Sequence, residues 1–233
     1  MQDILSGFIQ AIRLILSGDP ALYQVIMLSL QVTGAALLFS ALVGIPIGAW
    51  LGLRQFRGRW LVMALIYTGM GFPPVVVGLF VYLVLSRSGP LGDLAWLFTP
   101  KAMVVAQSII SFPLIAGFTM AAVMGVDPQL RQQVRSLGAS EGQATLAILS
   151  EARVGVVVSV IAGFGGIISE VGAVMLVGGN IEGKTRVLTT AIVLETRKGN
   201  FDVAMALGVI LLSLSFMANI VMLRLQGDGS LRR

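Results

Sequence analysis

Long apolar segments without charged residues dominate the pattern along this chain. No Asp, Glu, Lys or Arg occurs in residues 20–53, 60–86, 102–126 or 203–223, and Glu170 alone interrupts a fifth run over 154–181. Each run exceeds the roughly 18 apolar residues that indicate a membrane-spanning helix. The pattern therefore predicts an all-α membrane protein of about five transmembrane helices. They are expected at about residues 22–53, 60–86, 101–124, 154–179 and 203–224.

The first segment, residues 1–18, has a weaker apolar pattern. Ile4, Phe8 and Ile12 recur at helical spacing, while Asp3 stands where a signal peptide would be basic and Arg13 interrupts the apolar part. This arrangement predicts an amphipathic helix lying in the membrane interface, with a short sixth span as the alternative. The expected organisation is thus an interfacial helix over 1–18, a transmembrane domain over 19–226 and a tail over 227–233.

Prolines and glycines interrupt several of these spans. Pro46 and Pro113 favour kinks, because each removes a helix hydrogen bond. The denser cluster over residues 71–74 (GFPP) predicts a bend within the second span. Glycines between 163 and 179 make part of the fourth span smooth, which favours close helix packing, as in a dimer interface.

The segment between the third and fourth spans predicts two short helices joined at a glycine. Asp127 followed by Pro128 forms a helix start, and Gly138 permits a break. Ser140 with Gln143 forms a capping-box pattern that opens a second helix. This loop over 127–151 is therefore expected to be a helix–glycine–helix elbow that offers a rigid projection to a partner, with a plain surface hairpin as the alternative.

Composition narrows the chemistry. The chain is 56% hydrophobic and 12% charged, with no Cys and no His, whereas soluble domains carry about 25% charged residues. Without imidazole or thiol groups most enzyme mechanisms lose their usual parts, so no catalytic or metal site is expected. The net charge of +5 comes from short basic clusters between apolar runs, a pattern typical of membrane orientation rather than nucleic-acid binding. These clusters favour an N-terminus outside the cell and a cytoplasmic C-terminus.

A phosphate-loop pattern, G-x-x-x-x-G-K-[ST], occurs over residues 178–185 (GGNIEGKT). Too few residues follow Thr185 to complete a nucleotide-binding domain, and the next apolar run is a membrane span. The orientation also places the pattern outside the cell, where ATP is scarce. We interpret the match as coincidental.

The elbow carries a recognisable motif. Residues 135–140 (RSLGAS), with Ile148 downstream, resemble the cytoplasmic loop of permeases from binding-protein-dependent ABC importers, in which Gly138 and Ile148 match in register. Residues 132–134 and 150–151 depart from the family pattern. In that family the loop docks on the ATPase subunit. The resemblance thus implies an ATPase-coupling surface made by Arg131, Arg135, Leu137, Gly138, Ala139, Ser140 and Ile148.

The remaining motifs are closest to the tungstate-type (TupB-like) permeases, which are related to the molybdate permeases. They are residues 71–78 (GFPPVVVG), 85–90 (LSRSGP), 168–175 (ISEVGAVM) and 177–195 (VGGNIEGKTRVLTTAIVLE). The resemblance implies the type I ABC importer fold in a prokaryotic cell membrane. It also implies a homodimer of this subunit, two cytoplasmic ATPase subunits that use ATP and Mg²⁺, and an external oxyanion-binding protein. No cofactor is expected on this subunit itself.

Oxyanion transport requires hydrogen-bond donors along the pathway. The outer loop over 180–202 offers Asn180, Thr185, Arg186, Thr189 and Thr190 as pathway candidates, and Lys184 as a docking or solvated residue. Glu170 would repel a dianion, so we expect it to serve as a gate or dimer contact with a cationic or backbone partner. A molybdate or sulfate permease is the alternative within the class. An ion-coupled secondary transporter is a further one, although the chain shows no inverted repeat.

Overall fold

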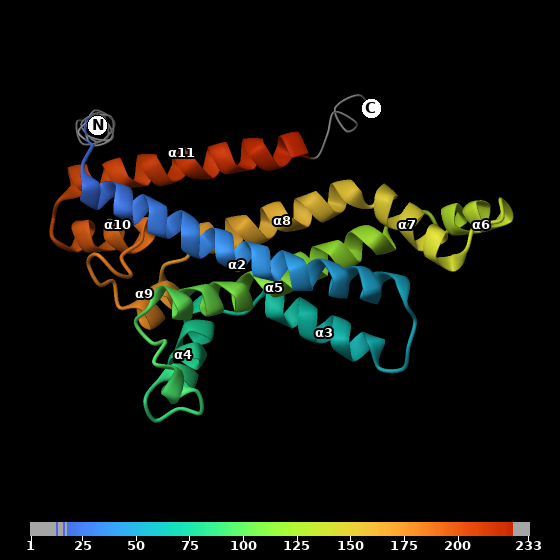
Figure 1. Ribbon diagram of the computed structural model, residues 1–233, viewed down its shortest axis with the longest axis horizontal. Helices are drawn as coiled ribbons and strands as arrows, with labels where there is room; N and C mark the ends of the chain where they lie inside the picture. The colour runs from blue at the N-terminus through green and yellow to red at the C-terminus, as the bar shows by residue number, and fades with distance from the viewer. Residues whose placement is uncertain (1–12, 14–15, 17, 226–233) are drawn as a thin grey trace. The chain divides into compact units, whose positions relative to one another are not determined.

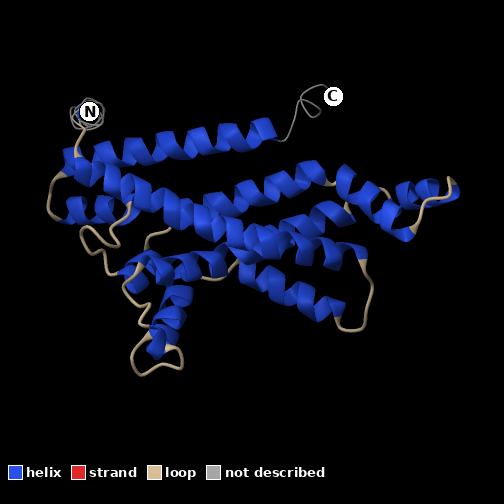
Figure 2. Ribbon diagram, in the orientation of Figure 1, coloured by secondary structure: helices blue, strands red, loops and turns tan. Residues whose placement is uncertain are grey.

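The computed structural model describes residues 13, 16 and 18–225. Within these residues every regular element is a helix and no strand occurs (Figure 2). The predicted interfacial helix over 1–18 and the tail over 227–233 lie outside the described residues, apart from residues 13, 16 and 18. The elements are α2 (Pro20–Leu53), α3 (Arg59–Met70), α4 (Pro74–Leu85), η1 (Gly92–Leu94), α5 (Pro100–Met124), α6 (Pro128–Ser136), α7 (Glu141–Glu151), α8 (Arg153–Ile168), α9 (Gly172–Gly178), α10 (Leu188–Arg197) and α11 (Phe201–Leu225).

Three of these helices are long and apolar enough to cross a membrane: Pro20–Leu53, Pro100–Met124 and Phe201–Arg224. Two further pairs, α3 with α4 and α7 with α8, reach that length only when each bent pair counts as one span, which brings the number to five. An all-helical polytopic membrane protein is therefore confirmed.

The break predicted in the second span is present. Helix α3 ends at Met70, and α4 begins at Pro74, the residue after Pro73. Neither proline has an N–H to continue a helix, and Pro74 occupies the first turn of α4, where that group has no intrahelical partner.

The helix expected over 154–179 is instead divided into α8 and α9. Helix α8 ends at Ile168, and α9 begins at Gly172. Between them the Glu170 carboxylate accepts a hydrogen bond of 2.9 Å from the Ala173 amide. A side chain that bonds the backbone in this way competes with the helical ladder, so the apolar run breaks at its one charged residue.

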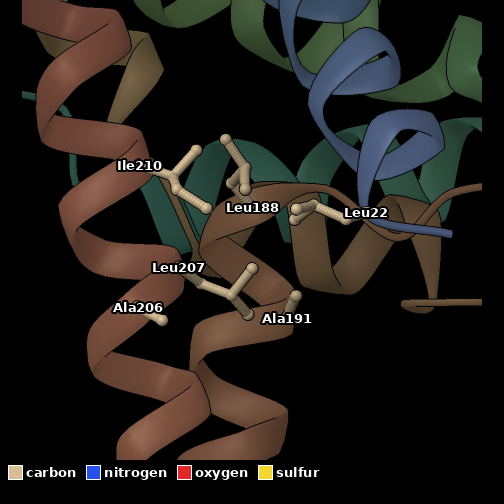
Figure 3. Close-up of a cluster of buried hydrophobic side chains, with 6 residues drawn as sticks. All are labelled: Leu22, Leu188, Ala191, Ala206, Leu207 and Ile210. Carbon is tan, nitrogen blue, oxygen red and sulfur yellow. The ribbon is translucent and has the colours of Figure 1, made fainter. Parts of the chain in front are cut away.

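The chain forms two compact units. Of the described residues, unit 1 comprises those up to 36 together with 73–109 and 167–219, and unit 2 comprises 37–72, 110–166 and 220–225. A core of unit 1 joins α10 to α11 through Leu188, Ala191, Ala206, Leu207 and Ile210, with Leu22 of α2 beside them (Figure 3). Elsewhere in unit 1, α4 approaches α9 so closely that a Cβ on Gly78 would lie 2.5 Å from Ala173 Cα.

In unit 2, α2 packs on α5 through glycines at four-residue spacing. A Cβ on Gly48 would clash with the Ala116 carbonyl oxygen, and one on Gly52 would lie 2.8 Å from Val123 Cβ. Residues four apart share one helix face, so these glycines form a groove that admits the α5 backbone. The hydroxyls of Ser40 and Ser111, 2.6 Å apart, join the same two helices.

Candidate coupling elbow and outer-loop site

Helices α6 and α7 of unit 2 form an elbow (Figure 1). The Asp127 carboxylate caps α6 by accepting a hydrogen bond from the Gln129 amide at 2.8 Å. Ser140 and Gln143 form the reciprocal capping box that opens α7, at 2.8 and 3.3 Å. Gly138 joins the two helices with φ of +88°, which is a left-handed conformation that glycine adopts without steric cost. The predicted helix–glycine–helix elbow is therefore present.

One carboxylate closes the elbow. The two oxygens of Glu141 on α7 lie 2.6 Å from Arg131 Nη2 and 2.7 Å from Arg135 Nη1, both on α6. The Arg131 hydrogen bond, followed by the charge of Arg135, holds the pKa of Glu141 below its ordinary value. Because Glu141 is exposed, these contacts contribute orientation more than stability.

The coupling candidates face different ways. Leu137, at the C-terminal end of α6, is 89% exposed, so it is accessible to a partner. Ile148 is only 7% exposed and packs with Ala49, Val123 and Ala152. Ile148 therefore anchors α7 to its own unit, while Leu137 projects from the turn.

Two open cavities flank the base of the elbow, both within unit 2. One measures about 490 Å³ and includes Asp127, Gln133 and Glu151 in its lining. The other measures about 430 Å³ and includes Arg59 and Arg131. The Arg59 guanidinium donates at 2.9 Å to the Leu51 carbonyl, which ties the start of α3 to the end of α2.

The loop between α9 and α10, in unit 1, is closed by its own backbone. The Ile181 carbonyl accepts from the amides of Lys184, Thr185 and Arg186 at 2.9–3.2 Å. The fully buried Thr185 hydroxyl donates to the Gly178 carbonyl at 2.6 Å and accepts from the Ile181 amide at 2.9 Å. Thr185 therefore holds the loop shut and is not free to bind a ligand.

This geometry also differs from that of a phosphate loop. In a phosphate loop the Gly-Lys-Thr sequence opens the following helix, and the hydroxyl binds magnesium. Here α10 begins only at Leu188, and the Thr185 hydroxyl is engaged with the loop backbone. Residues 178–185 thus form a turn that is held by its own hydrogen bonds, and they do not form a phosphate loop.

Thr189, Thr190 and Glu170 also bond to backbone groups. Thr189 donates at 3.0 Å to the Glu170 carbonyl. Thr190 is fully buried and accepts from the Val187 amide at 3.1 Å. With the Glu170 cap on Ala173, these contacts join the α8–α9 break to the start of α10. The sequence predicted that these hydroxyls donate to an anion. In the structure they form hydrogen bonds with backbone groups of the protein instead.

Arg186 and Asn180 retain unused hydrogen-bonding groups. Arg186 Nη1 lies 3.1 Å from the Glu182 carboxylate. Arg186 Nε and Asn180 Oδ1 are buried, and neither has a hydrogen-bond partner among the described residues. Of the predicted outer-loop candidates, these two keep capacity for a ligand.

Polar residues inside the apolar runs form further contacts, between groups distant in the sequence. In unit 1, Ser29 on α2 accepts from the Leu188 amide at 2.8 Å, and Gln107 donates to the Ile167 carbonyl at 3.1 Å. In unit 2, the hydroxyls of Thr119 and Ser159 lie 2.9 Å apart. A hydroxyl or amide within a charge-free run is the sequence signal for such links, since helices in lipid associate through these groups.

Residues 44–227 match the family model described as "Binding-protein-dependent transport system inner membrane component". The chain is 46% identical over 203 residues to "Probable anion ABC transporter permease protein" of Haloferax volcanii, covering 85% of this chain and 88% of that one. It is 41% identical over 228 residues to "Tungstate uptake system permease protein TupB" of Peptoclostridium acidaminophilum, covering 98% and 100%. The chain therefore belongs to the family of binding-protein-dependent ABC permeases.

A solved structure supports the fold. A bacterial alginate ABC transporter, in complex with an alginate pentasaccharide-bound periplasmic protein, has a chain that aligns with a TM-score of 0.71 at 22% identity. The alignment covers 98% of this chain and 89% of that one. The type I importer permease fold predicted from the sequence is confirmed, as is a multi-pass membrane protein. Permeases of this family act with an ATPase subunit and a substrate-binding protein.

Proposed function

We propose that this chain is the permease subunit of an ATP-driven importer of a tetrahedral oxyanion, with tungstate as the substrate. The end-to-end similarity to a permease named for tungstate uptake carries the proposal. Nearly the whole of both chains aligns, which includes the elbow and the outer loop. The anion permease of Haloferax volcanii agrees with the charge of the substrate.

The assembly proposed is a homodimer of this chain with two cytoplasmic ATPase subunits and an external oxyanion-binding protein. The elbow supports this arrangement, since Glu141 fixes the angle between α6 and α7 while Leu137 stays exposed for the ATPase. The ATPase would bind ATP and Mg²⁺, and this chain would bind no cofactor. Its role is transport, and the chemistry of hydrolysis belongs to the partner.

The proposed orientation puts the N-terminus outside and the C-terminus in the cytoplasm of a prokaryotic cell. It places the elbow inside, where the ATPase is, and the loop between α9 and α10 outside. Within that outer loop Arg186 and Asn180 are the proposed pathway residues. Glu170, Thr185, Thr189 and Thr190 would instead hold the pathway in shape through their bonds to backbone groups.

Reconstituted transport tests this proposal. The permease and its ATPase are incorporated in proteoliposomes with the binding protein outside, and uptake of tungstate, molybdate and sulfate is measured with and without ATP enclosed in the vesicles. We expect tungstate uptake that requires both ATP and the binding protein. Uptake of molybdate or sulfate alone would assign the alternative substrate, and uptake that persists without the ATPase would refute the importer assignment.

A further inference from the structure

The outer loop pairs a sheltered cation with an exposed anion. The Arg186 side chain is 20% exposed, whereas the Glu182 side chain is 78% exposed, and their charged groups meet at 3.1 Å. Exposed carboxylates exchange easily with solvent, and ion pairs of this kind contribute little stability. Glu182 can thus leave the pair at little cost while Arg186 stays in place.

Glu182 uses only part of the Arg186 guanidinium. Its carboxylate contacts Nη1, while Nε is buried and has no acceptor within the described part of the chain. An arginine presents its donors as a planar fork, in which Nε and one terminal nitrogen bind two oxygens of a carboxylate or phosphate-like anion together. The Nε edge of Arg186 is therefore a second donor edge on the same cation, open to an anionic oxygen.

The loop that carries Arg186 is held rigidly by the Thr185 hydroxyl and the Ile181 carbonyl. Asn180, in the same closed loop, has a left-handed backbone with φ of +51° and a buried side-chain oxygen without a partner among the described residues. An unsatisfied buried polar group is costly unless a ligand or water completes its bonding. Two such groups in one short loop point to a binding site rather than to a packed turn.

The other nearby carboxylate, Glu195, does not occupy Arg186. Glu195 lies near enough for Arg186 to contribute to lowering its pKa, after the larger effects of Lys198 and Asn200. Both carboxylate oxygens of Glu195 are already bonded, to Lys198 at 2.8 Å and Asn200 at 2.7 Å. Glu195 is thus held away from Arg186 by its own partners, which leaves Glu182 as the carboxylate in direct contact.

We infer that Glu182 is an internal counter-anion, which a tetrahedral oxyanion displaces when it binds the Arg186 guanidinium at the outer loop. The inference rests on the proposed function, and it adds that the Glu182 carboxylate competes with the oxyanion for Arg186. A dianion carries twice the charge of the carboxylate and offers several oxygens to the fork, so it can replace Glu182. In the absence of the oxyanion, the ion pair with Glu182 compensates the charge of Arg186.

Equilibrium binding of tungstate to the permease–ATPase complex in lipid nanodiscs, without the binding protein, tests this exchange. Omitting the binding protein matters, because its own affinity would otherwise set the measured value. Glu182→Gln removes the competitor, and we expect tungstate to bind about two- to five-fold more tightly, as the loss of an exposed ion pair allows. Arg186→Lys keeps the charge but loses the fork, and we expect weaker binding.

Two control variants separate the exchange from general charge effects. Asp93→Asn removes an acid from η1, elsewhere in unit 1, and Lys184→Gln removes an exposed cation two residues from Arg186. If Glu182→Gln changes tungstate affinity no more than Asp93→Asn, the inference is wrong. The same holds if Arg186→Lys weakens binding no more than Lys184→Gln.

Failure of the proposed function would look different. A wild-type importer that takes up no tungstate, molybdate or sulfate removes the oxyanion assignment, and the inference falls with it. An importer that takes up one of them, with all four variants alike, removes the inference alone. Should Arg186→Lys fail to assemble with the ATPase, Glu182→Gln still decides the outcome, because Glu182 is exposed and its loss leaves the loop bonds intact.

Discussion

Arg131 on α6 donates a 2.6 Å hydrogen bond to Glu141 on α7, across the turn at Gly138. Arg135, one helical turn further along α6, contacts the other carboxylate oxygen at 2.7 Å. A single carboxylate thus bridges two helices whose connection carries no other ion pair within the described residues. Removing that side chain should change the elbow without changing the membrane helices.

Glu141→Gln tests whether the Glu141 carboxylate holds α6 and α7 together. We expect faster hydrogen exchange in α6 and α7 and weaker stimulation of the ATPase, with exchange in α5 and α8 unchanged. The control is Glu151→Gln, at the other end of α7, where no ion pair is present in the described structure. Equal exchange in the two variants would contradict the role of Glu141.

Protonation of Glu141 at acidic pH should also speed hydrogen exchange in α6 and α7 of the wild-type protein. The pKa of Glu141 is lowered from its ordinary value of 4.5, mainly by the Arg131 hydrogen bond. A carboxylate with a depressed pKa contributes fully above its unfolded pKa, and the contribution disappears as the pH falls through the lowered value. Elbow protection should therefore stay constant from neutral pH down to about 4.5 and decline below it. In Glu141→Gln this decline should be absent.

Gly138→Ala isolates the backbone conformation of the turn. A Cβ at this position meets no atom within 4 Å, but the φ of +88° is unfavourable for any side chain. We expect a cost of about 1 kcal/mol in elbow stability and reduced ATPase association. Gly142→Ala, in the first turn of α7 and unhindered, should be neutral or stabilising. Hydrogen exchange of α6 measures both, and equal effects would show that Gly138 is not needed for its conformation.

Leu137→Ala tests the exposed side chain. At 89% exposure it makes few contacts within the chain, so the thermal stability of the permease should not change. If it enters an apolar site on the ATPase, association should weaken about five-fold or more, as for a typical buried anchor. Co-purification from membranes gives the comparison, and Leu137→Met should retain association. Unchanged association of Leu137→Ala would exclude Leu137 as an anchor.

Thr185→Val replaces the buried hydroxyl that closes the outer loop. It leaves the Gly178 carbonyl and the Ile181 amide without their partner, at an expected cost of about 1–3 kcal/mol. Thr185→Ser keeps the hydroxyl and should lose less. Thermal unfolding in detergent provides the measurement. A Thr185→Val variant as stable as wild type would show that the loop is held by other contacts.

Gly48→Ala tests the close packing of α2 on α5. The added methyl would clash with the Ala116 carbonyl, whereas Gly34 in the same helix has no atom within 4 Å of its Cβ position. We expect Gly48→Ala to destabilise by about 1–3 kcal/mol. Gly34→Ala should be tolerated. If both variants unfold alike, helix propensity rather than packing determines the effect.

Local signals predicted the local structure well. Asp127, Gly138 and the Ser140–Gln143 pair determine the elbow through bonds to their own neighbours, and the structure has each of them. The break at Pro73 and Pro74 follows equally from the missing N–H groups. Such features depend on residues a few positions apart, so a single sequence reveals them.

Long-range partners could not be predicted in this way. The sequence offered Thr185, Thr189 and Thr190 as ligand donors because they are hydroxyls near the membrane, but each hydroxyl bonds a backbone group of the protein. Ile148 matched a coupling motif, yet it packs inside its own unit. Which of several equivalent hydroxyls or apolar side chains turns inward depends on helices distant in sequence.

The sequence by itself determined that this chain is an all-helical membrane protein with an elbow, since charge-free runs and caps are local properties. Only the tertiary structure decided that the hydroxyls of Thr185 and Thr189 bond to backbone groups and that Arg186 keeps an unused hydrogen-bond donor. It likewise decided that Leu137 is exposed while Ile148 is buried. The physical reason is that satisfaction of polar groups and burial of apolar ones are properties of neighbours in space, and the order of residues alone does not provide them.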